Sequence, residues 1–369
     1  MTAQQTTNEP SVKQTGINQL NWFNSLRFIA LLAVITLHTA AVPLGNWGKI
    51  SHEQWQAANF YNALTRFAVP AFVMITGALL LGRDDELFNF LRRRLLRVIT
   101  PFLFWSLIYV AYGFYNEELV NTHNWWTNTK LILHQLKYGA SYHLWYVYML
   151  IGLYLIIPVL NKFIRHATKK EIQYFLVMWL SAMLVTQPYL QRFNPQIDIR
   201  YFTGYIGYLV LGYYLHRVVT IKISPLLCGA LFFALVAGIA IGTNLLYQHY
   251  NGISTLLYEP LSPSVLILSA TMFLWAMNWP VRLPAKLAMA RDFVGKYSYG
   301  VYLAHALVLL FMQDWGGLTY DYDNLKGIDY QLFNPWLSIP FTALVALAIT
   351  LPLVWLLSKV PVIGKYIAN

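Results

Sequence analysis

Apolar runs of about 20 residues recur along the chain, and this feature constrains the fold more than any other. A helix of that length crosses a hydrocarbon core about 30 Å thick. Hydrophobic residues make up 57% of the 369 residues and charged residues only 11%, whereas soluble domains carry about 25% charged residues. Because so much apolar surface can be buried only in lipid, the sequence predicts a polytopic integral membrane protein.

The runs predict an all-α fold of about ten transmembrane helices. The expected ranges are Trp22–Leu44, Asn59–Leu81, Leu95–Tyr115, Tyr142–Ile164, Ile172–Leu190, Tyr201–Val219, Pro225–Tyr247, Leu261–Asn278, Tyr297–Gln313 and Trp336–Lys359. They form a single transmembrane domain over residues 21–360, between a polar tail at 1–20 and a C-terminal tail at 361–369. The polar tail lacks the pattern of a cleaved signal peptide, so the first apolar segment is expected to remain as an anchor.

The distribution of the 26 Lys and Arg residues predicts the orientation. With both termini in the cytoplasm, most of these residues lie on the cytoplasmic side, as the positive-inside rule requires. The exceptions are Lys49, Arg66, Lys130, Lys137, Arg192, Arg200 and Lys326. Topology therefore accounts for the net charge of +11, and we expect no nucleic-acid partner. The single cysteine, Cys228, lies in an apolar run and provides neither a disulfide nor a thiol pair for a metal.

Arg27 and His38 lie eleven positions apart in the first apolar run. Eleven steps of a helix place them only about 20° apart around its axis and about 16 Å apart along it. One face thus carries an anion-binding group at the membrane boundary and a proton-transfer group deeper inside. We expect His38 to act as a general base, because a neutral imidazole is the usual base for a hydroxyl. A structural histidine between helices is the alternative.

A basic cluster, Arg92-Arg93-Arg94 followed by Arg97, precedes the third apolar run. Arg94 and Arg97 are three positions apart and share a helical face. Guanidinium groups bind phosphates through bidentate hydrogen bonds, which suits a nucleotide-bearing donor such as coenzyme A. Ordinary topology charge or contact with lipid head groups is the alternative.

Three further titratable groups lie in or beside apolar runs, where ionisable residues are rare. Arg66 precedes Val69-Pro70 and Thr76-Gly77, His143 opens the stretch that continues to Trp145, and His305 follows Tyr302 by three positions. Each one alone is more typical of an interhelical hydrogen bond. The aromatic outer loops, with Trp125, Trp126, Trp315 and Tyr320–Tyr330, are typical of an interfacial belt, and a glycan-facing role stays open.

Together these motifs resemble those of acyltransferase family 3, the membrane O-acyltransferases, and in particular an enterobacterial-common-antigen O-acetyltransferase branch. The matching elements, in the family's order, are Leu26-Arg27 through His38, Arg66 with Val69-Pro70 and Phe72, the Thr76-Gly77 pair, Arg93-Arg94 with Arg97, His143-Leu144-Trp145, and Tyr302 with His305. The resemblance covers nearly the whole chain. Two positions depart from it: Asn24 replaces an acidic residue, and Thr76 replaces a serine.

The resemblance implies transfer of an acyl group, most often acetyl, from cytoplasmic acyl-CoA to a hydroxyl of a cell-surface or lipid-linked saccharide. Arg27, Arg93, Arg94 and Arg97 would bind the donor, and His38 and Arg27 would be catalytic. Supporting roles would fall to Arg66, Thr76, His143, Trp145, Tyr302 and His305, with Arg66 or His143 as the oxyanion donor. The resemblance also implies a multi-pass protein of the bacterial inner membrane.

No permanently bound cofactor is expected, and acetyl-CoA serves as a co-substrate. No metal site is expected either, because no His and carboxylate cluster has the spacing of ligands. The expected partners are acyl-CoA, the saccharide or glycan acceptor and membrane lipids, and a homo-oligomer stays open.

Two other classes of protein share part of this pattern. A transporter or flippase of a lipid-linked sugar also needs buried Arg and His residues along an aqueous path. However, no pair of interrupted apolar segments recurs in the two halves of the chain. A subunit of a polysaccharide-export complex is the other alternative, and the intact pair of Arg27 and His38 weighs against it.

Overall fold

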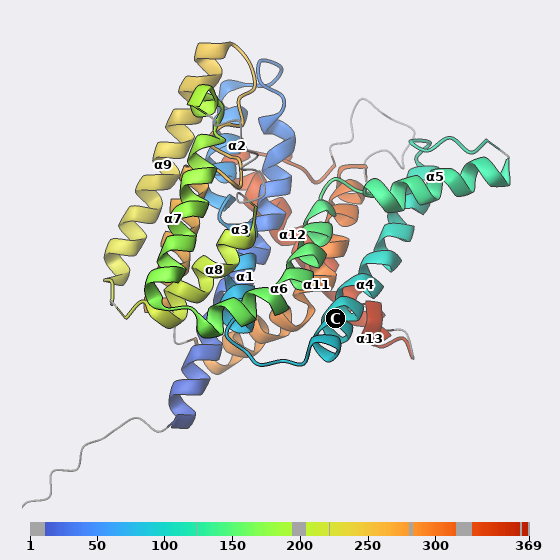
Figure 1. The fold of residues 1–369 in the computed structure, drawn as a ribbon. Helices are drawn as coiled ribbons and strands as arrows, with labels where there is room; N and C mark the ends of the chain where they lie inside the picture. The colour runs from blue at the N-terminus through green and yellow to red at the C-terminus, as the bar shows by residue number, and fades with distance from the viewer. Residues whose placement is uncertain are drawn as a thin grey trace, which may run out of the picture.

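The computed structural model describes residues 12–122, 124–193, 204–220, 222–279, 283–314, 327–361 and 364–367. All regular structure in these residues is helical (Figure 1). The helices are α1 (Val12–Leu44), α2 (His52–Thr65), α3 (Ala68–Leu80), α4 (Leu87–Tyr115), α5 (Trp125–Tyr138), α6 (Trp145–His166), α7 (Lys169–Val185), α8 (Ile206–Tyr213), α9 (Pro225–Tyr250), α10 (Pro263–Asn278), α11 (Ala285–Asp314), α12 (Pro335–Leu357) and α13 (Gly364–Ile367). A 3-10 turn, η1 (Pro188–Phe193), follows α7, and a π-helical turn, η3 (Tyr214–Val218), extends α8.

Seven segments of the described chain are long and apolar enough to cross a membrane. They are Asn21–Leu44, His52–Leu80, Leu87–Tyr115, Trp145–His166, Pro225–Tyr250, Ala285–Gln313 and Pro335–Leu357. Helix α10 is apolar but has only 16 residues. The all-helical, multi-pass character is therefore confirmed, while the count of about ten spans and the cytoplasmic position of both termini stay predictions.

Several helices differ from their predicted ranges. Helix α4 begins at Leu87 because the Glu86 carboxylate caps it, accepting hydrogen bonds from the backbone N–H groups of Phe88 (2.9 Å) and Asn89 (2.8 Å). The same two donors hold the pKa of the Glu86 carboxyl below its ordinary value. The early start places the whole basic cluster inside the first three turns of α4.

Three other expectations about the elements were wrong. Residues 125–138 form helix α5, with Asn124 as its N-cap, where an outer loop rich in aromatic residues was expected. Helix α11 begins at Ala285, twelve residues before the predicted start, and α7 ends at Val185 rather than at Leu190. The first residues of the expected Tyr201–Val219 span, together with Trp315 and residues 320–326, lie outside the described residues.

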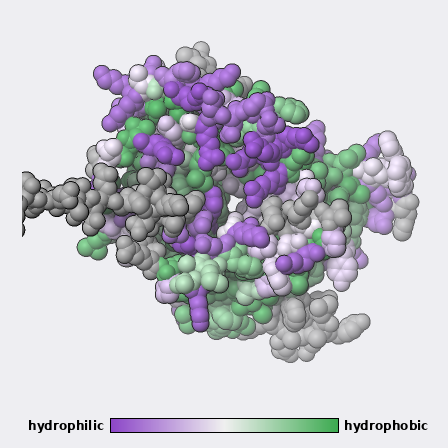
Figure 2. Space-filling view, turned by 90° about the horizontal axis from the view of Figure 1, so that it is seen from below, coloured by the Kyte–Doolittle hydropathy of each residue, from purple (hydrophilic) through white to green (hydrophobic). Residues whose placement is uncertain are grey.

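Helix α1 is the central element of the bundle and packs against α2, α3, α10, α11 and α12. Helix α4 contacts α6 and α11, whereas α5 projects to the side (Figure 1). We call the end at which α1 and α4 begin the basic end, because it carries Arg92, Arg93, Arg94 and Arg97. Figure 2 looks onto this end and shows hydrophilic residues gathered on it.

The second predicted span is broken between α2 and α3, at Arg66 and Phe67. Both residues keep helical backbone angles, and His52–Leu80 counts as one membrane-spanning segment. Pro70 has no backbone N–H and cannot donate to the carbonyl of Arg66, so one helical hydrogen bond is missing here. Beyond the break, α3 crosses α8 at very close range. A Cβ atom on Gly77 would lie 1.9 Å from the Leu209 carbonyl oxygen, and the absence of a side chain therefore permits this crossing.

Candidate active site

A cavity of about 270 Å³ lies between α1, α3, α4, α6 and α11 towards the basic end. We call it the anion cavity. Its lining includes Arg27, Thr76, Arg94, Arg97, Lys296 and Tyr302, together with Phe72, Val98, Tyr146, Leu150, Tyr154, Gly295, Ser298 and Tyr299. Four of these residues are basic and, among the described residues that line the cavity, none is acidic. Such a site favours a ligand with several negative charges.

The helical phase of α4 decides which arginines reach this cavity. Arg94 and Arg97 lie on the face that lines it, whereas Arg93 is turned about 100° away from Arg94. The Arg93 side chain is 70% exposed, lies 4.0 Å from Asp85 and donates to the backbone carbonyl of Asn89. Of the four donor-binding arginines predicted from the sequence, the cavity therefore brings together Arg27, Arg94 and Arg97 and leaves Arg93 outside.

Hydrogen bonds from the buried Arg291 link α11 to α1 at the basic end. Arg291 is only 5% exposed and pairs with Asp292 at 2.8 Å. It also donates to the Asn21 side chain (3.1 Å) and to the Ser25 hydroxyl (3.2 Å) on α1. Asn24 donates to the same Asp292 carboxylate at 3.0 Å. A carboxylate is thus present beside position 24 after all, although it comes from α11.

Three histidines from distant parts of the chain form a cluster in the other half of the bundle. His38 comes from α1, His143 from the turn before α6, and His305 from α11. The centroid of the His305 ring lies 5.2 Å from those of both other rings, and the centroids of His38 and His143 are 6.2 Å apart. Tyr142 contacts His38 with its ring centroid at 5.0 Å. Within the described residues, no group of His, Cys, Asp or Glu is arranged to hold a metal ion.

Hydrogen bonds fix the tautomers of the two fully buried histidines. Nε2 of His143 donates to the Leu303 carbonyl (3.3 Å), so its Nδ1 accepts from the Ser141 hydroxyl (3.1 Å). Nδ1 of His305 donates to the Tyr302 carbonyl (2.6 Å), which leaves a lone pair on Nε2 in the neutral ring. That Nε2 atom is buried and has no hydrogen-bond partner among the described residues. His305 therefore offers an acceptor within the cluster, and His143 has none left.

The hydroxyl of Tyr109 on α4 is hydrogen-bonded to the backbone of α11 beside His305. Its hydroxyl accepts from the Leu307 N–H (2.9 Å) and donates to the Leu303 carbonyl (2.9 Å), the two groups that pair in a regular α-helix. Tyr109 thereby fixes the turn of α11 on which His305 stands.

Tyr302 separates the anion cavity from the histidine cluster. Its ring lines the cavity and contacts the rings of His143 and His305, with centroids 5.6 and 5.7 Å apart. Its hydroxyl donates to the His143 carbonyl. Beyond the cluster, a second cavity of about 250 Å³ is lined by His38, Tyr142 and Gln313, among others. We call it the histidine cavity, and it lies towards the end of α1 opposite to the basic end.

The remaining predicted residues have different surroundings. Arg66 donates to the Asn62 side chain (2.8 Å) and stacks over the ring of Tyr258, 4.6 Å from its centroid, with its Nε unpartnered among the described residues. Thr76 lines the anion cavity but donates to the carbonyl of Phe72.

Trp145 is 42% exposed and lines neither cavity. Several residues that line the anion cavity were not among the predictions, and Lys296, Tyr146 and Tyr154 are the titratable ones that bear most on its chemistry. A signal for the tyrosines existed in the sequence. Tyr146 and Tyr154 are eight positions apart in the stretch after His143, and Leu150 lies midway between them. Tyr146, Leu150 and Tyr154 therefore fall on one helical face.

The comparison with family models matches residues 20–356 to an acyltransferase domain, Acyl_transf_3. The chain belongs to this acyltransferase family. Searches of curated proteins and of solved structures found no match. The family match establishes a membrane acyltransferase and agrees with the resemblance seen in the sequence, without confirming the enterobacterial-common-antigen branch.

Residues of the acyltransferase motifs are spread over most of the chain, but most of them lie close together in the folded bundle. Arg27, Arg94 and Thr76 surround the anion cavity, and His38 and His305 stand beyond the Tyr302 wall. Arg93 and Trp145 stand apart from both cavities. The geometry offers an anion site and a proton acceptor on opposite sides of a thin aromatic layer.

Proposed function

We propose that this acyltransferase moves an acyl group, most often acetyl, from acyl-CoA to a hydroxyl of a saccharide. The observation that carries the proposal is the anion cavity, whose basic side chains include Arg27, Arg94, Arg97 and Lys296 and which adjoins the histidine cluster through Tyr302. Neither a purely hydrocarbon substrate nor a neutral sugar would need this charge.

The donor fits the basic end of the site. Arg97 and Lys296 are exposed at the mouth of the cavity, and Arg27 and Arg94 are half-buried within it. Guanidinium groups form bidentate, charge-assisted bonds with phosphate oxygens. The phosphates of coenzyme A would be held here, and the extended arm that carries the thioester would point towards Tyr302. That arm would have to cover the distance from Arg27 to His38, which is about 16 Å along α1.

The acceptor fits the other side of the cluster. His38 lines the histidine cavity and is partly exposed there, so a hydroxyl entering that cavity can reach its ring. In the proposed step, His38 removes the hydroxyl proton while the oxygen attacks the thioester carbonyl carbon. The C–S bond then breaks, an ester forms, and the departing thiolate of coenzyme A takes up the proton that His38 removed, which regenerates the neutral base.

His305 and Arg66 have distinct supporting roles in this proposal. His305 is a positioning residue, because its free Nε2 can accept a hydrogen bond from the N–H of the adjacent His38 ring. Such a bond exposes the other nitrogen of His38 as a base. Between the two predicted oxyanion stabilisers we favour Arg66, whose buried Nε has no partner among the described residues, since His143 already uses both ring nitrogens.

We further propose a cell-surface or lipid-linked saccharide as the acceptor and the bacterial inner membrane as the location. The basic end would face the cytoplasm, because Lys and Arg accumulate on that side of a membrane and acyl-CoA is cytoplasmic. The support is the resemblance of the motifs to glycan-modifying members of the family. Acetyl-CoA then acts as a co-substrate rather than as a resident cofactor.

The test measures release of coenzyme A from acetyl-CoA by membrane vesicles that contain the wild type, the His38→Ala variant or the His134→Ala variant. His134 is an exposed histidine on α5 and serves as the matched control. We expect His38→Ala to lower release by about 10²- to 10⁴-fold, the usual range for loss of a general base. The control should match the wild type.

Two outcomes would overturn parts of the proposal. Equal release by His38→Ala and the wild type would remove His38 from the reaction. If the vesicles show no release above empty vesicles and the purified protein does not bind acetyl-CoA in equilibrium dialysis, the donor assignment is wrong.

A further inference from the structure

Arg66 carries a positive charge at the junction of α2 and α3, within a segment that is long and apolar enough to cross the membrane. Among the residues that the structure describes, it forms no ion pair with a carboxylate. Glu259, which follows Tyr258, accepts a hydrogen bond from the Thr255 hydroxyl at 2.8 Å. Because an arginine stays protonated in a protein, a charge at this depth needs another source of stabilisation.

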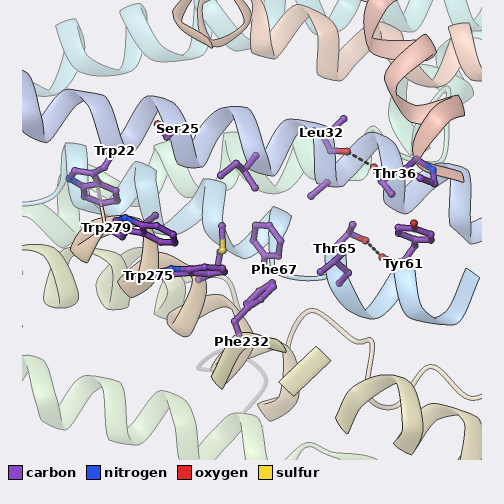
Figure 3. A pocket seen from close by; sticks show the side chains of 16 residues that line it. Trp22, Ser25, Leu32, Thr36, Tyr61, Thr65, Phe67, Phe232, Trp275 and Trp279 are labelled. Carbon is purple, nitrogen blue, oxygen red and sulfur yellow. Dashed lines mark hydrogen bonds between the residues drawn. The ribbon is translucent and has the colours of Figure 1, made fainter. Parts of the chain in front are cut away.

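The contacts of Arg66 lie in the interior of the bundle. Its neighbours Thr65 and Phe67 line an apolar groove of about 490 Å³ behind α1, whereas Arg66 is not part of that lining (Figure 3). The guanidinium instead contacts Asn62 and Tyr258, which are 0% and 1% exposed. The charge is therefore held among buried side chains and away from the groove.

Tyr258 stabilises this charge without occupying its hydrogen-bond donors. The Cζ atom of Arg66 lies over the Tyr258 ring, 4.6 Å from its centroid. The face of an aromatic ring attracts a cation, and the attraction is strongest where water is excluded. A carboxylate would instead accept bonds from the N–H groups at the edge of the guanidinium. Those groups stay available here, and Nε has no partner among the described residues.

The Tyr258 ring is itself fixed by α2 and α9. Tyr258 lies in the turn between α9 and α10, where its N–H donates to the Thr255 carbonyl at 2.8 Å. Its hydroxyl donates to Asn59 on α2, through the backbone carbonyl oxygen at 3.0 Å and the side-chain carbonyl oxygen. The side-chain amide of Asn59 donates in turn to the Ala240 carbonyl on α9 at 2.8 Å. The ring cannot turn without breaking these bonds.

We propose that Tyr258 is a positioning residue that holds the Arg66 guanidinium with its Nε edge free for the oxyanion. The inference rests on the proposed function, in which Arg66 donates to the thioester oxygen as negative charge develops on it. Asn62 accepts from one terminal nitrogen of Arg66 at 2.8 Å, and the ring covers one face, so a rotation of the guanidinium would break both contacts. A donor that is held in place beforehand stabilises the oxyanion without a cost of reorganisation.

The test changes the electrons of the ring while keeping its shape. Membrane vesicles contain the full chain with Tyr258→Phe, or with a phenylalanine at position 258 that carries one, two or three ring fluorines, introduced by a suppressor tRNA. Fluorine withdraws electrons from the ring face and weakens its attraction for a cation, whereas the size of the ring hardly changes, so folding should be equal. We expect kcat for release of coenzyme A to fall with each fluorine, by at least about tenfold over the series. The KM for acetyl-CoA should stay constant, because the phosphates bind elsewhere.

Two controls separate positioning from a structural role. The same series at Tyr250, which is 65% exposed at the end of α9, should leave kcat unchanged. In the Arg66→Gln background, which should lower kcat about 10²- to 10³-fold as loss of an oxyanion donor does, the series at position 258 should have no further effect. The charge on which the ring acts is then absent.

The outcomes distinguish this inference from the proposed function. An active wild type with the same kcat throughout the series at position 258 would refute the positioning role alone. An equal fall in the Arg66→Gln background would refute it as well, because Tyr258 would then act independently of Arg66. Wild-type vesicles that release no coenzyme A above empty vesicles would refute the proposed function, and this inference with it.

Discussion

Arg93 and Arg94 are neighbours in the sequence, but the fold gives them different roles. Arg94 is half-buried and lines the anion cavity, whereas the Arg93 side chain is 70% exposed outside it. Replacing each by glutamine removes one positive charge from nearly the same place on α4. The pair therefore tests whether the donor phosphates occupy this cavity rather than a diffuse basic surface.

The expected magnitude follows from the surroundings of each arginine. A hydrogen bond to a charged group contributes about 1.5–3 kcal/mol, so Arg94→Gln should raise the KM for acetyl-CoA about 10- to 150-fold. The Arg93 side chain is 70% exposed and does not line the cavity, so it would act on a bound phosphate only through water and salt, which screen the charge. Arg93→Gln should therefore change KM by less than about fivefold, the limit for an exposed charge pair. Because the phosphates lie far from the reacting carbon, kcat should change little in both variants.

The assay is the initial rate of coenzyme A release at several acetyl-CoA concentrations, in vesicles with equal amounts of each variant. The measurement is repeated at high ionic strength, where the difference between the wild type and Arg94→Gln should shrink because salt screens the phosphate contact. If Arg93→Gln raises KM as much as Arg94→Gln, the phosphates do not bind in the anion cavity and the assignment fails.

Three further perturbations test other parts of the structure. Tyr109→Phe removes the hydroxyl that is hydrogen-bonded to α11 and should lower stability in detergent by about 1–3 kcal/mol, because buried backbone groups lose a partner; an unchanged thermal midpoint would argue against this role. Gly77→Ala should prevent correct folding, because its Cβ would lie 1.9 Å from the Leu209 carbonyl oxygen, whereas Gly238→Ala, with open space around it, should fold normally in size-exclusion chromatography. His305→Gln keeps an acceptor near the Nε2 position and should retain more activity than His305→Ala, with an altered pH profile of kcat/KM; equal loss in both variants would indicate that packing alone is required.

Local patterns in the sequence are sufficient for the class of protein and for part of the site. Apolar runs of membrane-spanning length predict a multi-pass helical protein, since the bilayer thickness alone sets that length. The shared face of Arg27 and His38 follows from helical periodicity, which acts between near neighbours. The motif order led to the family, and the family match agrees with it.

The contacts between distant helices could not be read from the sequence. Periodicity says which residues share a face but not which face meets which neighbour. Only the packed bundle shows that Lys296 joins the arginines while Arg93 does not, or that Asp292 stands beside Asn24. The free Nε2 of His305 depends on a hydrogen bond and on burial by other helices. The groove behind α1 likewise exists only because α2, α9, α10 and α12 leave a gap between their side chains, which is a property of packing.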